Sequence, residues 1–265
     1  MLDFPTHGQQ TDRIVDAAEL LAKSRVPRVF ITVSLDGPPS VHDRIRGVQG
    51  SWDRAVETFL RLRRIQRRGQ RVFLGMTLQP DNVDSFDDLV DSVRRHVPDL
   101  SPREVHVNLV HESSHYYGNE GVAKLDPERA ERAFARIREA RADRLRPHPV
   151  SWLEHRYQKL AERWIRTGRS PMPCRAVRSS IFIDSFGEVR PCTIWDRSLG
   201  NLRDHDFDLA RILDHTEAKD AADGAATGRC PQCWTPCEAY PTLLANALPR
   251  PAKGPLATAK RSEDR

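Results

Sequence analysis

All five cysteines of this 265-residue chain lie between residues 174 and 237, and their spacing limits what that part of the chain can form. Cys174 and Cys192 frame the pattern C-x12-G-x4-C, and Cys230, Cys233 and Cys237 follow in the pattern C-x2-C-x3-C. Two residues between cysteines let the backbone wrap around one metal centre, so that both thiolates can bind it. The spacing therefore indicates a metal centre with these five cysteines as candidate ligands.

The segment between the first two cysteines predicts a hairpin. Two short β-branched runs flank Ser185-Phe186-Gly187, and glycine suits the tight turn between two strands. Such a hairpin would carry Cys192 back towards Cys174, which makes this pair the strongest ligand candidates.

The three later cysteines offer more thiols than a four-iron cluster needs. The C-x2-C spacing favours Cys230 and Cys233, because neighbouring thiolates can then reach two irons of one cube. Cys237 precedes an apolar run, 239–248, which we expect to be helical. A thiolate in a first helical turn is stabilised by the helix dipole, so Cys237 could replace either member of the pair.

Three kinds of cysteine chemistry compete for this pattern. Disulfides fit poorly, because five is an odd number, no secretory signal is evident, and a cytosolic chain keeps its thiols reduced. Four thiolates suit tetrahedral zinc and an iron–sulfur cluster equally well. The spacing alone leaves zinc and iron–sulfur open.

Upstream of the cysteines, hydrophobic periodicity predicts helices that alternate with strands. Capping patterns mark the starts of four helices: Thr11-Asp12, the boxes Ser85–Asp88 and Ser151–Glu154, and Asp126-Pro127. A further helix is expected over 52–68, strands over 29–34, 71–77 and 104–110, and a long loop over 35–50. This order is typical of an α/β fold with a parallel sheet and right-handed crossovers.

Composition argues against membrane and nucleic-acid partners. Charged residues make up 30% of the chain, mean hydropathy is −0.61, and no apolar run approaches the ~20 residues that span a bilayer. The net charge of +5 is a small surplus, and the arginine-rich run 61–71 is typical of a solvated helix end. We expect a cytoplasmic protein with a disordered tail over 250–265.

A polar segment follows the first predicted strand and carries Ser34, Asp36 and Arg46. In a βα barrel this end of a strand carries the chemistry. The serine and the arginine could hold a ribose hydroxyl and a carboxylate there, the arginine as a bidentate fork. Residue chemistry alone favours a simpler interpretation, a polar loop with a local Arg–Asp ion pair.

Both regions resemble the radical S-adenosylmethionine (SAM) enzyme family. Ser34–Gly37, His42-Asp43 and Arg46-Gly47 are similar to the motif that ends the fourth strand of the radical SAM barrel. The cysteines, with Gly187 and residues 199–202, resemble the Twitch or SPASM extension that follows this barrel and holds an auxiliary 4Fe–4S cluster. The single-cluster Twitch form fits better, because a full SPASM domain needs more cysteines.

The resemblance implies an incomplete parallel (β/α) barrel over 1–168 and a small cysteine-rich α+β extension over 169–249. It implies SAM contacts for Ser34 and Arg46 and a loop-shaping role for Asp36. Five further residues could line the site, although each fits an ordinary loop or core position as well: Thr77, Asn82, Asn108, His111 and Tyr116. An intact enzyme of this kind is an oxidoreductase that cleaves SAM to modify a peptide or a small molecule.

The resemblance is incomplete at the N-terminal side. The C-x3-C-x2-C motif that holds the SAM-cleaving cluster in this family is absent, and Thr6-His7-Gly8 lies where the family's third strand often reads Thr-Asn-Gly. We therefore expect an N-terminally truncated gene product or a degenerate relative, with an open strand edge that could self-associate. The alternative is a non-catalytic interaction protein that binds zinc or one iron–sulfur cluster.

Overall fold

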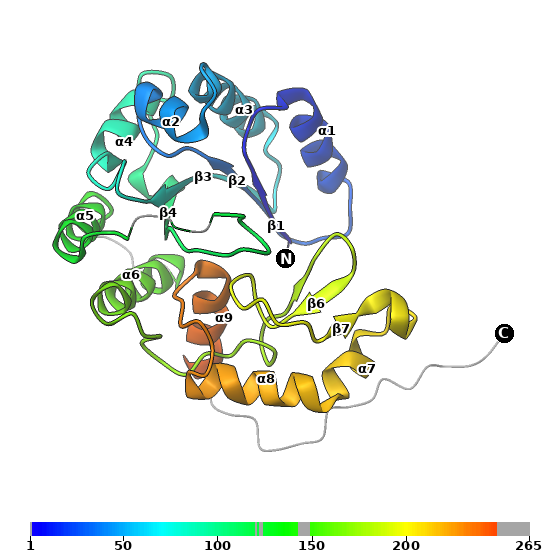
Figure 1. Ribbon diagram of the computed structural model, residues 1–265. Coiled ribbons are helices and arrows are strands. Elements are labelled where there is room, and N and C mark those ends of the chain that lie inside the picture. The colour runs from blue at the N-terminus through cyan, green and yellow to red at the C-terminus, as the bar shows by residue number, and fades with distance from the viewer. Residues whose placement is uncertain (1, 120, 122–123, 143–148, 248–265) are drawn as a thin grey trace.

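A computed structural model describes residues 2–119, 121, 124–142 and 149–247 (Figure 1). Residues 2–168, here called the sheet region, contain one parallel four-stranded sheet with the strand order β1-β2-β3-β4. Its strands are β1 (Leu2–Thr6), β2 (Val29–Ser34), β3 (Gln70–Leu78) and β4 (Val105–Leu109). Its helices are α1 (Thr11–Ala22), α2 (Pro39–Arg46), α3 (Ser51–Ile65), α4 (Phe86–Arg94), α5 (Pro127–Ala140) and α6 (Pro149–Thr167), with a short 3-10 turn, η1 (Pro102–Glu104). The predicted α/β class with a parallel sheet is confirmed.

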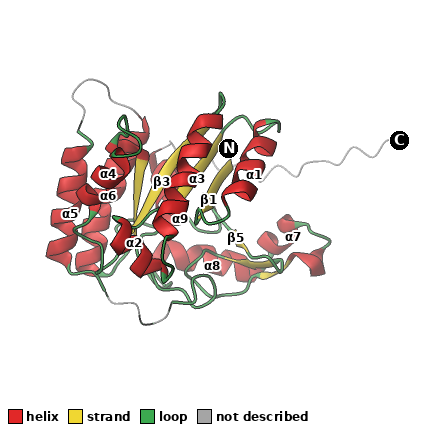
Figure 2. Ribbon diagram, turned by 90° about the horizontal axis from the view of Figure 1, so that it is seen from above, coloured by secondary structure: helices red, strands yellow, loops and turns green. Residues whose placement is uncertain are grey.

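Alternation along each strand gives the sheet two different faces. In β2, Val29, Ile31 and Val33 are buried, whereas Thr32 and Ser34 on the other face are half-buried. Helices α1 and α3 run beside the strands (Figure 2), and their apolar stripes belong to the same core as the buried face of β2. Helix α9 and strand β6 lie across the sheet from α1 and α3 (Figure 1).

Three local expectations in the sheet region need correction. The predicted loop 35–50 contains helix α2. Residues 2–6, where periodicity predicted no strand but the resemblance placed the family's third strand near Thr6, pair with β2 from Leu2↔Val29 to Thr6↔Val33. Helices α1 and α4 begin close to where their patterns indicated, but neither start has a side-chain cap hydrogen bond. The Ser85 box therefore does not form, because Ser85 is not in the extended conformation that a capping side chain needs.

Two other predicted helix starts have different outcomes. Asp126 caps α5 as expected: its carboxylate accepts from the Arg129 N–H, and Pro127 follows at the first helical position. Helix α6 begins at Pro149, ahead of the predicted box at Ser151. The expected tail over 250–265 lies outside the described residues.

Strand β1 forms one edge of the sheet in the part of the chain that the structure describes. Its fourth residue, Pro5, has no N–H to offer a further strand, which weakens this edge as a pairing template. Self-association through β1 stays a prediction.

Residues 169–247, here called the cysteine-rich region, contain shorter elements. Their bounds are β5 (Phe182–Ile183), β6 (Glu188–Arg190), β7 (Gly200–Asn201), η2 (Leu202–His205), α7 (Leu209–Asp214), α8 (Thr216–Thr227) and α9 (Pro236–Ala247). The three strands form one antiparallel sheet, so the predicted hairpin is present as β5–β6. Helices α7 and α8 were not predicted. Helix α9 was expected over 239–248 and begins three residues earlier.

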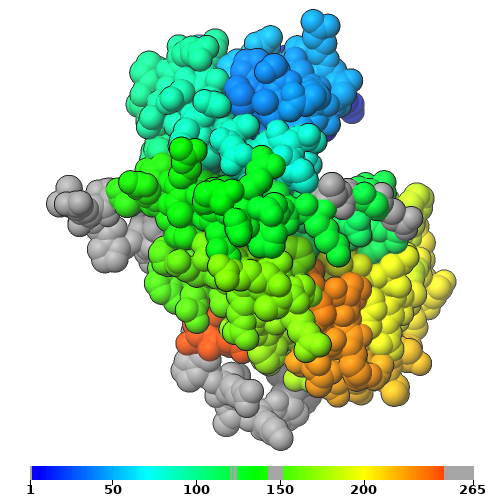
Figure 3. Space-filling view, turned by 60° about the vertical axis from the view of Figure 1, so that its left-hand side comes forward, coloured from blue at the N-terminus to red at the C-terminus, as the bar shows by residue number. Residues whose placement is uncertain are grey.

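The two regions share a core. Trp234, Ala239 and Leu243 from the cysteine-rich region are buried with Tyr157 and Ala161 of α6 in the cluster that also fills the sheet. In Figure 3 the green residues of α5 and α6 form a band between the blue and cyan part and the yellow and orange part. The boundary proposed near residue 168 therefore crosses a continuous apolar interior. No helix within the described residues is both long and apolar enough to cross a membrane.

Candidate cluster site

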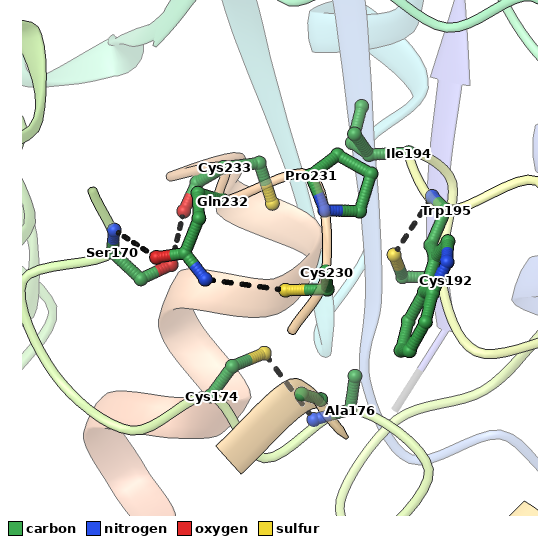
Figure 4. Close-up of a pocket in the computed structure, with 11 residues that line it drawn as sticks. Ser170, Cys174, Ala176, Cys192, Ile194, Trp195, Cys230, Pro231, Gln232 and Cys233 are labelled. Atoms are coloured by element: carbon green, nitrogen blue, oxygen red, sulfur yellow. Dashed lines mark hydrogen bonds between the residues drawn. The ribbon is translucent and has the colours of Figure 1, made fainter. Parts of the chain in front are cut away.

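Four of the five cysteines line one small pocket (Figure 4). Cys174 follows α6, Cys192 follows β6, and Cys230 and Cys233 lie in the loop between α8 and α9. Their sulfur atoms point into the same space in Figure 4, beside Ile194 and Trp195. The pocket thus collects thiols from three chain segments that are far apart in sequence.

The β5–β6 hairpin carries the first two cysteines together. Its turn is built by Asp184, whose carboxylate accepts from the N–H groups of Phe186 and Glu188 at 2.8 and 3.0 Å. Gly187 has a φ of +88°, a conformation that glycine adopts without strain. The return strand β6 then delivers Cys192, which is buried, to the pocket that Cys174 also lines.

The loop that carries Cys230 and Cys233 is held by side chains of the sheet region and the segment after α6. Trp164 Nε1 donates to the Gln232 carbonyl at 2.8 Å, and Ser170 Oγ donates to the Cys233 carbonyl at 2.8 Å. The Trp234 N–H donates to His111 Nε2 at 3.0 Å. These contacts fix the backbone on both sides of Cys233.

His111 lies between the sheet and this loop. Because Nε2 accepts from a backbone N–H, the proton is on Nδ1, which donates to the Leu109 carbonyl at 3.0 Å. The ring also stacks on Trp164 with centroids 4.5 Å apart. Burial lowers the pKa of His111 to about 4, so the ring is neutral at physiological pH.

Three of the pocket sulfurs accept hydrogen bonds. The N–H of Ala176 lies 3.4 Å from Cys174 Sγ, and the N–H of Trp195 lies 3.3 Å from Cys192 Sγ. The side-chain amide of Gln232 lies 3.6 Å from Cys230 Sγ (Figure 4). Donors of this kind stabilise negative charge on sulfur and so favour thiolates as metal ligands.

The pocket is otherwise an apolar environment for charge. Burial raises the pKa of Cys174, raises that of Cys192 to about 12, and raises that of Cys233 further. Burial likewise raises the pKa of the nearby Glu238 carboxyl to about 7, despite its hydrogen bond with Ser180. The thiols of Cys174, Cys192 and Cys233 are therefore protonated at neutral pH, and a metal centre would displace those protons on binding.

The donor set fits an iron–sulfur cluster. All five cysteines are free thiols, and four of them face one space. Within the described residues, no three His, Cys, Asp or Glu side chains are grouped closely enough to hold a single metal ion. A 4Fe–4S cluster differs from a zinc ion in this respect. Each of its four irons binds one cysteine thiolate, so the four cysteine sulfurs need not lie as close together as they would around one zinc ion.

Cys237 is placed differently from the other four. It lies in the first turn of α9, is exposed, and does not line the pocket. Its thiol lies near the hydroxyl of Tyr117. Burial raises the pKa of that hydroxyl most, and the neighbouring Cys237 raises it further. Tyr117 in turn packs against Tyr116, with ring centroids 4.6 Å apart.

The predicted SAM-contacting residues lie together at the carboxyl end of β2. Asp36 is buried, and its carboxylate pairs with Arg46 Nη2 at 2.7 Å and accepts from the Thr77 N–H at 3.2 Å. The Asp36 N–H donates to Nδ1 of the buried His42 at 3.0 Å. Ser34 is the last residue of β2, half-buried and opposite Gly75 of β3. The local Arg–Asp ion pair of the simpler interpretation is therefore present.

The five residues that could line the site divide into two groups. Thr77 and Asn108 face each other in the β3–β4 register, both half-buried, and Tyr116 is exposed in the loop after β4. Asn82 is fully buried and donates to the carbonyls of Asp36 and Thr77, so it holds the loop after β3. His111 holds the cysteine loop as described above.

Some contributors were not identified from the sequence, among them Gln232, Trp164 and Ser170, and His42 was named only as part of a motif and without a contact. Gln232 stands between the two cysteines of the C-x2-C loop, and His42 stands in the segment that resembles the radical SAM motif. A polar side chain inside a ligand loop was the available signal for Gln232. For His42 the sequence offers no indication that its ring accepts a backbone hydrogen bond from Asp36.

A family model described as SPASM, an iron–sulfur cluster-binding domain, matches residues 174–234. No curated protein sequence matches the chain.

Two similar solved structures are described as native anSMEcpe with bound AdoMet and as native anSMEcpe with bound AdoMet and Cp18Cys peptide. Each is 14% identical with a TM-score of 0.51; the matches cover 88% and 84% of this chain. They cover 63% and 60% of those two chains, so this chain spans less than two thirds of either. At this identity the likeness concerns the fold. The domain match and the shared fold together make the chain similar to radical SAM proteins that carry a SPASM iron–sulfur extension.

Proposed function

We propose that the cysteine-rich region binds one auxiliary 4Fe–4S cluster through Cys174, Cys192, Cys230 and Cys233. The observation that carries this proposal is the convergence of these four thiols, within the SPASM-matched segment, on one pocket. Cys237 lies outside the pocket and supplies no ligand. One cluster accounts for the four inward-facing thiols, which supports the single-cluster Twitch form of the extension.

The whole protein to which this chain contributes would then be a radical SAM enzyme. Arg46 is 35% exposed, and its bond to Asp36 engages only Nη2, so other N–H groups of its guanidinium are available for a carboxylate. The Ser34 hydroxyl, at the same end of β2, would hold a ribose hydroxyl. In this arrangement Asp36 orients Arg46, and Asn82 and the Thr77 N–H orient Asp36.

The substrate class is a peptide or a small molecule. One of the similar structures holds AdoMet together with a peptide, which makes a peptide the first ligand to test. When bound, the auxiliary cluster supplies either a site for substrate or a one-electron relay. The chain's own contribution is to hold the four thiolates and to donate hydrogen bonds to the sulfurs of Cys174, Cys192 and Cys230.

Anaerobic reconstitution of the chain with iron and sulfide tests the cluster. We expect about four irons and about four sulfides per chain for the wild type. Cys174→Ala and Cys192→Ala should lose most of this iron. Cys237→Ala is the matched control, and it should retain wild-type iron and absorbance.

Three outcomes would overturn this proposal. One is a full cluster in both Cys174→Ala and Cys192→Ala. Another is that Cys237→Ala loses its iron while Cys233→Ala retains it. That result would make Cys237, and not Cys233, the fourth ligand of the cluster. The third is stoichiometric zinc binding with no sulfide uptake, which would favour a non-catalytic zinc-binding interaction protein.

A further inference from the structure

We propose that Gln232 raises the reduction potential of the auxiliary cluster by donating a side-chain hydrogen bond to the Cys230 thiolate. This inference rests on the proposed function, because it needs a cluster in the pocket. It assigns a separate role to a residue that is not itself a ligand.

The orientation of the Gln232 amide is determined by its partners. The Ser170 N–H donates to Gln232 Oε1 at 3.0 Å, and a backbone N–H can only donate. The oxygen therefore faces Ser170, and Nε2 faces Cys230 Sγ at 3.6 Å. Rotating the amide by half a turn would place an N–H against an N–H on one side and an oxygen against a sulfur on the other.

The backbone of Gln232 is held as firmly as its side chain. Its φ is +60°, a left-handed conformation that non-glycine residues seldom adopt. Its carbonyl accepts from Trp164 Nε1, and the next carbonyl, of Cys233, accepts from Ser170 Oγ. The amide is thus presented to Cys230 by a loop whose backbone is held at two successive carbonyls.

The Gln232 amide occupies space that is free because Gly228 has no side chain. A Cβ at Gly228 would lie 2.7 Å from Gln232 Nε2, and the φ of Gly228, +78°, already favours glycine. The end of α8 therefore passes directly beside the amide and limits its movement away from Cys230.

A hydrogen bond to a cluster sulfur has a defined electrostatic effect. Reduction adds one negative charge to the cluster and its thiolates, and an N–H dipole aimed at a sulfur stabilises that charge, which raises the potential. The donors to Cys174 and Cys192 are the backbone N–H groups of Ala176 and Trp195, which remain when the side chain is replaced by any residue other than proline. The donor to Cys230 belongs to the side chain of Gln232, so a single substitution removes it.

The test is a redox titration of the reconstituted chain, followed by electron paramagnetic resonance. No cysteine precedes Cys174, so the signal reports the cluster in this pocket. Gln232→Met keeps the length and removes the N–H. We expect a more negative midpoint potential, by up to about tenfold in the reduction equilibrium constant, or about 59 mV for one electron. Gln232→Glu keeps an acceptor for the Ser170 N–H, adds negative charge beside the sulfur, and should shift the potential further in the same direction.

Cys237→Ala is the matched control. Cys237 lies outside the pocket, and its replacement leaves the contacts of Gln232 and Ser170 in place, so the potential should equal that of the wild type. The inference is overturned if Gln232→Met binds wild-type iron at an unchanged potential, or if Cys237→Ala shifts the potential as much as Gln232→Met does. If Gln232→Met takes up no iron, the midpoint potential of Gln232→Glu is compared with that of the wild type instead, and an unchanged potential overturns the inference. Failure of the wild type to form any cluster would instead contradict the proposed function.

Discussion

The sheet region and the cysteine-rich region are stabilised by different means. In the sheet region, strands of five to nine residues and helices of eight to 19 residues enclose one large apolar cluster. In the cysteine-rich region the strands have two or three residues, and its separate clusters contain only five and three buried residues. The first region can be stabilised by apolar burial, whereas the second has too little apolar area for that alone.

Ion pairs do not replace the missing apolar burial in the cysteine-rich region. Arg190 pairs with both Asp184 and Asp196 at 3.0 Å, and Asp220 pairs with both Arg197 and Arg229. Ion pairs at the surface, even when partly buried as Arg190–Asp184 is, each contribute about 0–1 kcal/mol. Small domains with modest cores commonly depend on a bound metal as a cross-link. A cluster in this pocket would therefore stabilise the cysteine-rich region as well as supply chemistry.

The largest expected effect is a core truncation in the sheet region. Ile31 of β2 is fully buried in the main cluster, so Ile31→Ala should lower the free energy of unfolding by about 4–5 kcal/mol. Ile212, equally buried in the small cluster, is the matched site. Ile212→Ala should cost about 2 kcal/mol, because loosely held surroundings collapse around the lost volume. Urea denaturation measures both, and equal costs would contradict the comparison.

Loading with iron and sulfide should stabilise one region only. The Leu199 N–H donates to the Val189 carbonyl in the cysteine-rich region, and the Leu35 N–H donates to the Gly75 carbonyl in the sheet. We expect about 1,000-fold slower hydrogen exchange at Leu199 after loading, equivalent to about 4 kcal/mol, and little change at Leu35. Mass spectrometry of the loaded and apo forms checks this, and equal slowing at both amides would show that the regions fold as one unit.

Acid should weaken the link between the regions through His111. Its pKa in the folded chain, about 4, is below the 6.5 of an unfolded chain. The unfolded chain therefore takes up the proton first, and stability is lost as the pH falls from 6.5 to 4, by at most about 3 kcal/mol.

The matched variant for this effect is His111→Gln, which keeps an acceptor for the Trp234 N–H and does not titrate. Urea denaturation of the reduced apo chain at about pH 7 and about pH 5 should show a smaller loss for the variant than for the wild type. Burial also lowers the pKa values of His42 and His106, and these two residues contribute the same loss of stability to the wild type and to the variant. Identical losses in the two chains would show that His111 does not carry this pH dependence.

The smallest stability effect is expected at Arg46. Arg46→Ala leaves the Asp36 carboxylate, 4% exposed, without its cation. Because Arg46 itself is 35% exposed, we expect a loss of about 1–2 kcal/mol, between the values for surface and buried pairs. Asp36→Asn is the companion variant, since its amide oxygen still accepts from the Thr77 N–H.

Arg46 also tests the proposed SAM contact. In the whole protein, Arg46→Ala should weaken SAM binding by about 1.5–3 kcal/mol, as measured by calorimetry. Unchanged affinity together with lowered stability would limit Arg46 to its ion pair with Asp36.

Much of the sheet region could be predicted from hydrophobic periodicity. Strands β2, β3 and β4 and helices α1, α3 and α5 follow from apolar spacing and helix start signals. Strand β1 could not, because Leu2–Thr6 is short, contains Pro5 and becomes a strand only by pairing with β2. Helix α8 was missed for another reason: its buried face consists mainly of alanines, such as Ala218, Ala221 and Ala225, which give a weak apolar pattern.

The fold class, the hairpin and the group of candidate ligands could be predicted from the amino-acid order, because each depends mainly on residues close together along the chain. Spacing predicts how one loop bends, as with Gly187 in the β5–β6 turn. Which thiols share a pocket depends on tertiary packing, since Cys174 and Cys233 meet through the packing of α9 on α6. The contacts of His111 with Trp234 and of Arg46 with Asp36 likewise depend on how separate segments pack, a property that local spacing does not encode.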